Sequence, residues 1–188
     1  MSEFLPAVLR GGVDIVQLRE KHADRAAIAA GATEMLAICR DFNVPFIVND
    51  DPTLAAEVNA DGVHVGQDDS NVTTCRALLG SDAIVGLSTH APDEFTAALL
   101  EPVTYRSAGP IVPTPTKRGR EATGVGYALE CQSLSTEPVF VTGGVSPETL
   151  PDLLRLGLRY FVAVRALTDA PDPEEAARQM AALIHDAL

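Results

Sequence analysis

The sequence of 188 residues predicts an α/β protein in which helices cover a parallel β-sheet. Short apolar segments of the strand type alternate with segments of helical apolar spacing along the whole chain, which is typical of parallel sheets. Helix-capping sequences stand before several of the helical segments. No linker, low-complexity segment or change of composition divides the sequence, so we expect one domain over residues 1–188.

The segments predicted as strands are short, rich in Val, Ile and Phe, and bounded by turn or polar residues. Seven segments satisfy this description, and in chain order they are 13–19, 46–48, 62–65, 84–87, 103–108, 139–142 and 160–164.

Helices are predicted between these strands from apolar spacing and from caps. Residues 26–40 place apolar side chains on related faces of one helix. A proline directly after Asp51 predicts a cap and a first turn for a helix over 52–59. Ser-Pro-Glu at 146–148 and Asp-Pro-Glu-Glu at 172–175 have the same pattern, so we expect helices to begin there as well.

Two architectures fit this order of elements, an open doubly wound sheet and an eight-fold barrel. No Gly-x-Gly-x-x-Gly turn follows the first predicted strand, which argues against a dinucleotide-binding sheet. The barrel needs one strand more than the pattern supplies. Periodicity alone therefore leaves both architectures open.

Composition argues against several classes of function. The formal net charge is −12, whereas sequence-independent nucleic-acid binding needs a basic surface. No apolar run approaches the roughly 18 to 20 residues of a membrane span, and the N-terminus does not resemble a signal peptide. Cys39, Cys75 and Cys131 have neither disulfide nor zinc spacing. We expect a soluble cytoplasmic protein with reduced thiols, acting on small molecules.

Two neighbouring predicted strands end in carboxylates and amides. Asn-Asp-Asp at 49–51 follows one strand, and Gln-Asp-Asp at 67–69 follows the next. Since the carboxyl ends of adjacent parallel strands lie at one edge of a sheet, we expect the two clusters to meet. A pair of carboxylates suits a hard cation such as Mg²⁺. The alternative for any single acid is helix capping, and it applies most directly to Asp51 and Asp68.

The first predicted strand has a polar face. Alternation puts Val16 and Leu18 on one side, and Gln17, Arg19 and Lys21 on the other. In a parallel sheet covered by helices both faces are buried, so this polar face is expected to meet a ligand or the mouth of a barrel. A surface strand with solvated charges is the alternative.

Two later loops are predicted to bind anions. In a Pro-rich loop, Thr114, Thr116 and Lys117 offer hydroxyl, backbone and ammonium donors to an anion such as diphosphate. Gly144 precedes a predicted helix N-terminus, where backbone N–H groups converge, and the last strand ends beside it at Arg165. A stiff loop and tight backbone packing are the respective structural alternatives.

The histidines give little indication of acid–base chemistry. His64 lies inside an apolar strand, and we expect it to pack there rather than to catalyse. His90 follows the strand 84–87 closely, but no nucleophile and base can be grouped around it. The polar residues therefore indicate a metal site and anion sites.

Six short motifs occur in a fixed order. They are VQLREK at 16–21, VNDD at 48–51, ADGVHVGQDD at 60–69, GLSTH at 86–90, GPIVPTPTK at 109–117 and GGV at 143–145. In order and spacing they resemble the thiamine-phosphate synthase family. The resemblance implies a (β/α)8 TIM barrel and a transferase. This transferase joins 4-amino-5-hydroxymethyl-2-methylpyrimidine diphosphate to a thiazole phosphate, giving thiamine monophosphate and diphosphate with Mg²⁺ by a dissociative mechanism.

The same resemblance implies roles for individual residues. It implies that Asp50 and Asp69 bind Mg²⁺ and that Ser88 contacts the pyrimidine. The pyrimidine diphosphate group would be held by Gln17, Arg19, Lys21, Asn49 and Lys117. The thiazole phosphate would be held by Thr114, Thr116 and backbone groups near Gly144 and Arg165. The residues implied to act in catalysis are Arg19, Lys21, Lys117 and Ser88.

The sequence departs from the family at its N-terminus, where the family has a further strand. We therefore expect a barrel that lacks its first strand and has unpaired edges at 13–19 and 160–164, a feature that favours homo-oligomers. Two other functions stay open. One is a truncated, catalytically silent protein that binds thiazole phosphate, and the other is a thiazole tautomerase-like enzyme. The diphosphate and metal residues argue against the tautomerase.

Overall fold

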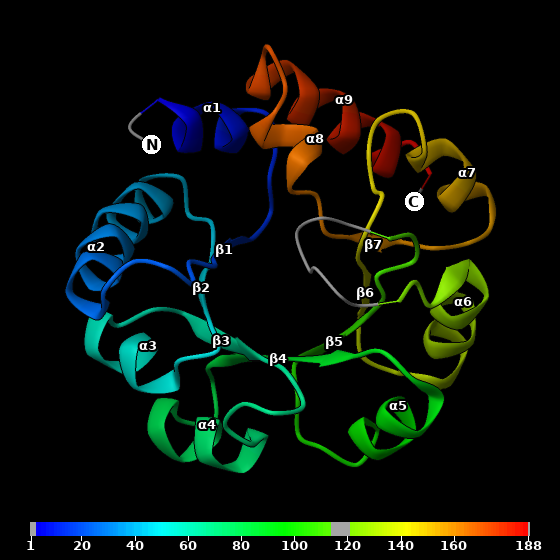
Figure 1. Cartoon of the computed structure of the whole chain (residues 1–188). Helices are drawn as coiled ribbons and strands as arrows, with labels where there is room; N and C mark the ends of the chain where they lie inside the picture. Colours follow the sequence, from blue (N-terminus) through cyan, green and yellow to red (C-terminus); the bar gives the residue numbers. More distant parts are fainter. Residues whose placement is uncertain (1–2, 114–120, 188) are drawn as a thin grey trace.

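Each strand of the sheet pairs in parallel with the strand that follows it in the sequence. The computed structural model describes residues 3–113 and 121–187. Its sheet has seven strands in the order β1-β2-β3-β4-β5-β6-β7. In Figure 1 the strands lie in the middle of the molecule and the helices lie around them. This order confirms the predicted parallel α/β sheet and excludes the doubly wound alternative, in which the strand order reverses.

All seven predicted segments contain a strand. The strands are β1 (Val16–Leu18), β2 (Phe46–Asn49), β3 (Gly62–Val65), β4 (Ile84–Thr89), β5 (Tyr105–Ala108), β6 (Val139–Val141) and β7 (Tyr160–Phe161). The predicted bounds 13–19 and 160–164 were too wide for the first and last strands. Both are edge strands with one neighbour, so each extends only as far as its single ladder. The ladder of β1 with β2 has three residue pairs, and that of β7 with β6 has two.

The helices follow the predicted order with one displaced start. They are α1 (Phe4–Arg10), α2 (Arg25–Asp41), α3 (Pro52–Val58), α4 (Val72–Leu79), α5 (Pro92–Ala98), α6 (Gly124–Leu134), α7 (Leu150–Arg155), α8 (Arg165–Thr168) and α9 (Pro173–His185). Asp51 caps α3 by accepting a hydrogen bond from Leu54 N at 2.8 Å. Asp172 likewise caps α9 through Glu175 N at 3.0 Å.

The helix predicted to begin at residue 146 begins at Leu150 instead. Residues 146–149 form a hydrogen-bonded turn, because the Thr149 hydroxyl donates to Gly144 O at 2.7 Å and accepts from Ser146 N at 3.0 Å. The prediction of a helix N-terminus directly after Gly144 was therefore wrong. Leu150 N still donates to Ser146 O at 2.9 Å, but the next residue is Pro151, which has no N–H to form the following helical bond.

Alternate residues of each strand face the helices and the opposite side of the sheet, as the two-residue period of a strand requires. The helix-facing side is apolar and almost wholly buried, with side chains such as Phe46, Val63, Val85 and Val141 in the main core. We call the opposite side the inner face, and its side chains include His64, Ser88, Tyr105 and Phe140. The sheet therefore has a dry outer core and a more polar inner face.

The edge strands β1 and β7 do not pair with each other in the part of the chain that the structure describes. Helices α1, α8 and α9 lie on this side of the molecule, at the top of Figure 1. Arg10 Nε of α1 donates to Glu174 Oε2 of α9 at 2.8 Å, which joins the first helix to the last. Among the described helices, none is long and apolar enough to span a bilayer. All three cysteines are free and buried.

Candidate active site

Asp50 and Asp69 come together at the carboxyl ends of β2 and β3, as the sequence predicted. Asp50 has a φ of +67°, a conformation that is uncommon outside glycine, and its backbone N donates to His64 O at 2.8 Å. Asp69 Oδ2 accepts a hydrogen bond from Gly66 N at 2.7 Å. The two carboxyl groups lie close enough for each to shift the pKa of the other. The turn after each strand thus directs one carboxylate toward the other.

The charges around this pair are arranged asymmetrically. Lys21 Nζ lies 2.8 Å from Asp50 Oδ2. Burial acts to raise the pKa of Asp50, but hydrogen bonds with Lys21 and Asp69 and the charge of Arg19 outweigh it, so this pKa lies below its ordinary value. Burial and the neighbouring Asp50 raise the pKa of Asp69. The two carboxylates repel each other, and a cation placed between them would remove that repulsion.

The donor set of this pair fits Mg²⁺. Carboxylate oxygens are ligands that Mg²⁺ prefers, and the ion commonly takes one or two of them together with water and substrate phosphate oxygens. Within residues 3–113 and 121–187, no group of three or more His, Cys, Asp or Glu side chains could hold a metal. Asp50 and Asp69 would therefore leave most coordination positions to water and to a phosphate ligand.

The polar residues of the β1 segment divide between two places. Arg19 and Lys21 lie beside the acid pair, where both lower the pKa of Asp50. Gln17 hydrogen-bonds instead to the hydroxyl of Tyr105 on the inner face. Asn49 ends β2, is partly buried, and pairs in register with His64 of β3. The structure thus brings the predicted cations and Asn49 to the acid pair, whereas Gln17 reaches below it.

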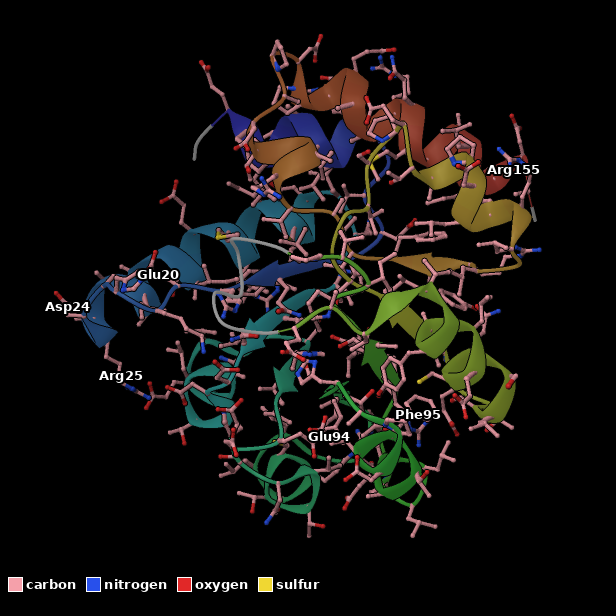
Figure 2. The ribbon with its side chains drawn as sticks, turned by 45° about the vertical axis from the view of Figure 1, so that its right-hand side comes forward. Glu20, Asp24, Arg25, Glu94, Phe95 and Arg155 are labelled. Atoms are coloured by element: carbon pink, nitrogen blue, oxygen red, sulfur yellow. The ribbon has the colours of Figure 1, made fainter. Side chains whose placement is uncertain are left out.

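Local hydrogen bonds hold the segment that carries Lys21. Glu20 Oε1 accepts from His22 N at 2.6 Å, and Asp24 caps α2 through Ala27 N. Figure 2 shows Glu20, Asp24 and Arg25 gathered at the beginning of α2. Arg25 pairs with Glu57 Oε2 of α3 at 2.9 Å. The connection between β1 and α2 is therefore fixed at both ends, which keeps Lys21 close to Asp50.

A buried polar network lies on the inner face below the acid pair. Ser88 Oγ of β4 is 2.7 Å from His64 Nε2, and His64 Nδ1 is 2.9 Å from the Tyr105 hydroxyl. The rings of His64 and Tyr105 stack with their centroids 5.4 Å apart. The expectation that His64 packs inside the sheet is confirmed. Its connection to Ser88 was missed, although strand alternation with the observed register places both residues on one face.

Gly86 leaves the space that the stacked rings occupy, and this makes a testable prediction. A Cβ at this position would lie 2.2 Å from Tyr105 Cζ and 2.4 Å from His64 Nδ1. We expect Gly86→Ala to lower the free energy of unfolding by about 1–3 kcal/mol, the usual cost of overpacking. Urea denaturation would measure the change.

Gly31 provides the matched control for this substitution. It lies within α2, and a Cβ there would meet nothing within 4 Å. Gly31→Ala should be neutral or stabilise the protein by up to about 1 kcal/mol, because alanine favours helices. Equal stabilities of the Gly86 and Gly31 variants would contradict the packing argument.

The loops after β5 and β6 pack closely on each other. Ile111 N donates to Thr142 O at 2.8 Å. Gly144 has a φ of +74°, and a Cβ there would lie 2.3 Å from Val112 Cγ2, so only glycine suits the position. Arg165 begins α8, is exposed, and lines a surface pocket together with the 146–148 turn. The structure therefore places Arg165 beside the turn that follows Gly144, as the sequence suggested.

Thr114, Thr116 and Lys117 lie outside the described residues. The structure describes the chain up to Pro113 and again from Glu121. Thr123 N donates to Pro110 O at 2.8 Å, so the two described sides of this loop meet at the carboxyl end of β5. The roles of these three residues stay predictions.

Comparison with known proteins agrees with this arrangement. Residues 1–167 match the family model described as thiamine monophosphate synthase. A thiamine-phosphate synthase of Thermus thermophilus is 44% identical over 173 residues, which are 92% of this chain and 83% of that protein. One from Acidothermus cellulolyticus is 42% identical over 186 residues, covering 97% of this chain and 87% of that protein.

Solved structures show the same fold. Thiamine phosphate pyrophosphorylase from Pyrococcus furiosus superposes with a TM-score of 0.90 at 22% identity, covering 99% of this chain and 90% of that one. 3-Hexulose-6-phosphate synthase from Salmonella typhimurium gives 0.72 at 19% identity, with 98% and 92% covered. At these identities the structures support the fold alone, whereas the family model and the sequence relatives identify the family. The chain belongs to the thiamine monophosphate synthase family.

Proposed function

We propose that this protein joins 4-amino-5-hydroxymethyl-2-methylpyrimidine diphosphate to a thiazole phosphate, giving thiamine monophosphate and diphosphate. The thiamine-phosphate synthases that resemble it over most of their length support this reaction. The observation that carries the proposal is the cluster of Asp50, Asp69 and Lys21, in which two carboxylates and an ammonium group meet at one sheet edge. Such a cluster suits a diphosphate bound together with Mg²⁺.

The proposal includes a fold of the (β/α)8 barrel class. Strands β1 to β7 follow one another in chain order with helices on the outside, which is the order of a barrel. The unpaired edges of β1 and β7 support self-association of the chain. A biosynthetic reaction on small phosphorylated substrates supports a cytoplasmic location.

Diphosphate departure is the step that the charged residues assist. The bond between the pyrimidine methylene carbon and the diphosphate oxygen breaks first, and the thiazole nitrogen then attacks the methylene cation. Arg19 and Lys21, with Lys117 as a further predicted cation, bind the leaving diphosphate as its charge concentrates. Mg²⁺ held by Asp50 and Asp69 would neutralise part of that charge. Asn49 would donate a hydrogen bond to the diphosphate, whereas Gln17 lies below the acid pair against Tyr105. No general base is needed.

The thiazole phosphate is assigned to the opposite side of the site, at the loops after β5 to β7. Backbone groups near Gly144 and the start of α8 at Arg165 would hold it, together with Thr114 and Thr116. The close packing of these two loops supports this assignment, because it makes a stiff surface at the carboxyl ends of β5 and β6.

Diphosphate release tests the proposed function. With Mg²⁺ and both substrates, the purified chain is expected to release diphosphate and thiamine monophosphate in equal amounts. A thiazole tautomerase would convert thiazole phosphate without releasing diphosphate. A silent binding protein would bind thiazole phosphate but release nothing at high enzyme concentration. Either of these two results would contradict the synthase.

A further inference from the structure

His90 follows β4 directly and donates a hydrogen bond to the loop after β5. The side chain is partly buried, and its Nδ1 lies 2.5 Å from Gly109 O. A carbonyl oxygen can only accept a hydrogen bond, so His90 Nδ1 must carry a proton and donate it. This holds for the neutral ring and for the imidazolium ion alike. The partner atom therefore fixes the role of Nδ1.

The backbone of His90 is itself held in place. Helix α5 has no N-cap side chain, and Glu94 of its first turn instead accepts from His90 N through Oε2 at 2.7 Å. The Tyr127 hydroxyl of α6 donates to Ala91 O, one residue further, at 3.0 Å. The His90 side chain thus extends toward β5 from a fixed piece of backbone.

The loop after β5 begins with a turn that is bonded on several sides. Gly109 has a φ of +141°, and a Cβ there would lie 2.5 Å from Thr142 Oγ1, so the position requires glycine. Pro110 O accepts from Thr123 N, and Ile111 N donates to Thr142 O, both at 2.8 Å. The segments before α6 and after β6 therefore hold residues 110 and 111, and the histidine holds the Gly109 carbonyl from the side of β4.

We infer that His90 is a positioning residue, which through Nδ1 fixes the Gly109 carbonyl and with it the start of the loop that carries Lys117. The inference rests on the proposed function, in which Lys117 binds the leaving diphosphate. A cation stabilises developing charge most effectively when it is already in place before the bond breaks. His90 would therefore contribute to turnover without contacting either substrate.

Two amide substitutions test which ring nitrogen matters. Asparagine places a donor near the position of Nδ1, whereas glutamine places one near the position of Nε2. His90→Asn should keep its kcat within about twofold of the wild type, and His90→Gln should lose about tenfold, the size of one lost hydrogen bond. Diphosphate release at saturating Mg²⁺ and both substrates would measure kcat.

Other results of this comparison would overturn the inference. Higher turnover of His90→Gln than of His90→Asn would mean that Nε2 is the nitrogen that matters. Equal turnover of the two variants, at the wild-type level or below it, would mean that the effect does not follow the bond to Gly109. Each of these results requires an active wild-type enzyme, so each leaves the proposed function standing.

The histidine proton tests the same contact without any turnover. The chain has four histidines, so ¹⁵N-labelled histidine gives few signals, and the His90→Asn variant identifies the one from His90. At alkaline pH, where the ring is neutral, we expect its proton on Nδ1. A neutral wild-type ring protonated on Nε2 would overturn the inference, whether or not the protein is a synthase.

Thr123→Val is the matched control from the opposite side of the loop. The Thr123 hydroxyl donates to Pro110 O at 3.2 Å, but its backbone N donates to the same oxygen at 2.8 Å and stays in the variant. Its kcat should equal that of the wild type. Thermal denaturation of all the variants separates positioning from stability, because His90→Gln should lose turnover while it is still folded. If its lost turnover only matched its unfolded fraction, His90 would have no positioning role.

Discussion

Asp69→Asn is expected to reduce turnover at least about a hundredfold, the usual cost of removing one preorganised charge-stabilising group. Asp69 shares the site with Asp50 and is held toward it by Gly66 N at 2.7 Å. An amide at this position keeps the size of the side chain but loses the charge that attracts Mg²⁺. Diphosphate release at saturating substrate and Mg²⁺ would measure the loss, and Asp50→Asn should behave similarly.

The same substitution should stabilise the metal-free fold. Two carboxylates in contact repel each other, so replacing one of them with a neutral amide relieves the repulsion. In the absence of Mg²⁺, the Tm of Asp69→Asn should equal or exceed that of the wild type. Mg²⁺ should raise the Tm of the wild type more than that of the variant. A ligand stabilises the folded protein only when it binds there, and the variant has lost one of the two carboxylates. Opposite changes in activity and stability would distinguish a site residue from a folding residue.

Asp68→Asn is the matched control for this prediction. Asp68 is the adjacent acid in the sequence and is exposed. Its replacement should leave both turnover and the response to Mg²⁺ close to those of the wild type. Near-wild-type turnover of Asp69→Asn, or equal losses in the two variants, would contradict the assignment of Asp69.

The meeting of Asp50 with Asp69 was predictable in part from strand order, because neighbouring parallel strands end at one edge of the sheet. Asp69 lies four residues beyond β3, and the turn in which it accepts from Gly66 N completes the approach. The strand bounds were less predictable. Residues 13–15 read as part of the first strand, but β1 begins only at Val16, where its ladder with β2 begins. Sequence periodicity indicates which residues can form a strand, whereas the neighbouring strand decides how many of them do.

The network of Tyr105, His64 and Ser88 was not predictable from any single segment. It needs the register of two ladders, in which His64 pairs with Gly86, Gly86 with Tyr105, and Ser88 with Ser107. It also needs a glycine at position 86, where a side chain would collide with both rings. The late start of α7 has a different cause, since Pro151 has no N–H to continue the ladder that begins with Leu150 N and Ser146 O.

Arg106→Met should cause the largest loss of stability among the substitutions considered. Arg106 is 1% exposed and lies on the helix-facing side of β5. Its Nε and Nη2 donate to Ala98 O at 2.9 and 2.7 Å, which joins β5 to the end of α5. Its Nη1 donates to Ser135 Oγ at 3.1 Å and to Glu137 Oε2 at 2.7 Å. One guanidinium group therefore joins α5, β5 and the segment between α6 and β6.

Methionine preserves the length and the apolar stem of arginine but provides no donor. The Ala98 carbonyl would then lose both guanidinium donors and keep only the hydrogen bond from Glu101 N at 3.2 Å, in a place where Ala98 is 2% exposed. Hydrogen bonds to a charged group contribute about 1.5–3 kcal/mol each, so we expect a loss of about 3 kcal/mol in urea denaturation. Turnover of the folded variant should be little changed, since Arg106 faces away from the inner face.

Glu137→Gln separates the ion pair from the hydrogen bonds of the guanidinium group. The Glu137 side chain is 40% exposed, so water can replace much of what Arg106 supplies to it. A partly exposed ion pair contributes little, so the stability of this variant should stay close to that of the wild type. Arg106→Lys should fall between the two, because an ammonium group keeps the charge but cannot reach Ala98 O, Ser135 and Glu137 together. If Arg106→Met proved no less stable than Glu137→Gln, the buried hydrogen bonds to Ala98 O could not be what holds β5 to α5.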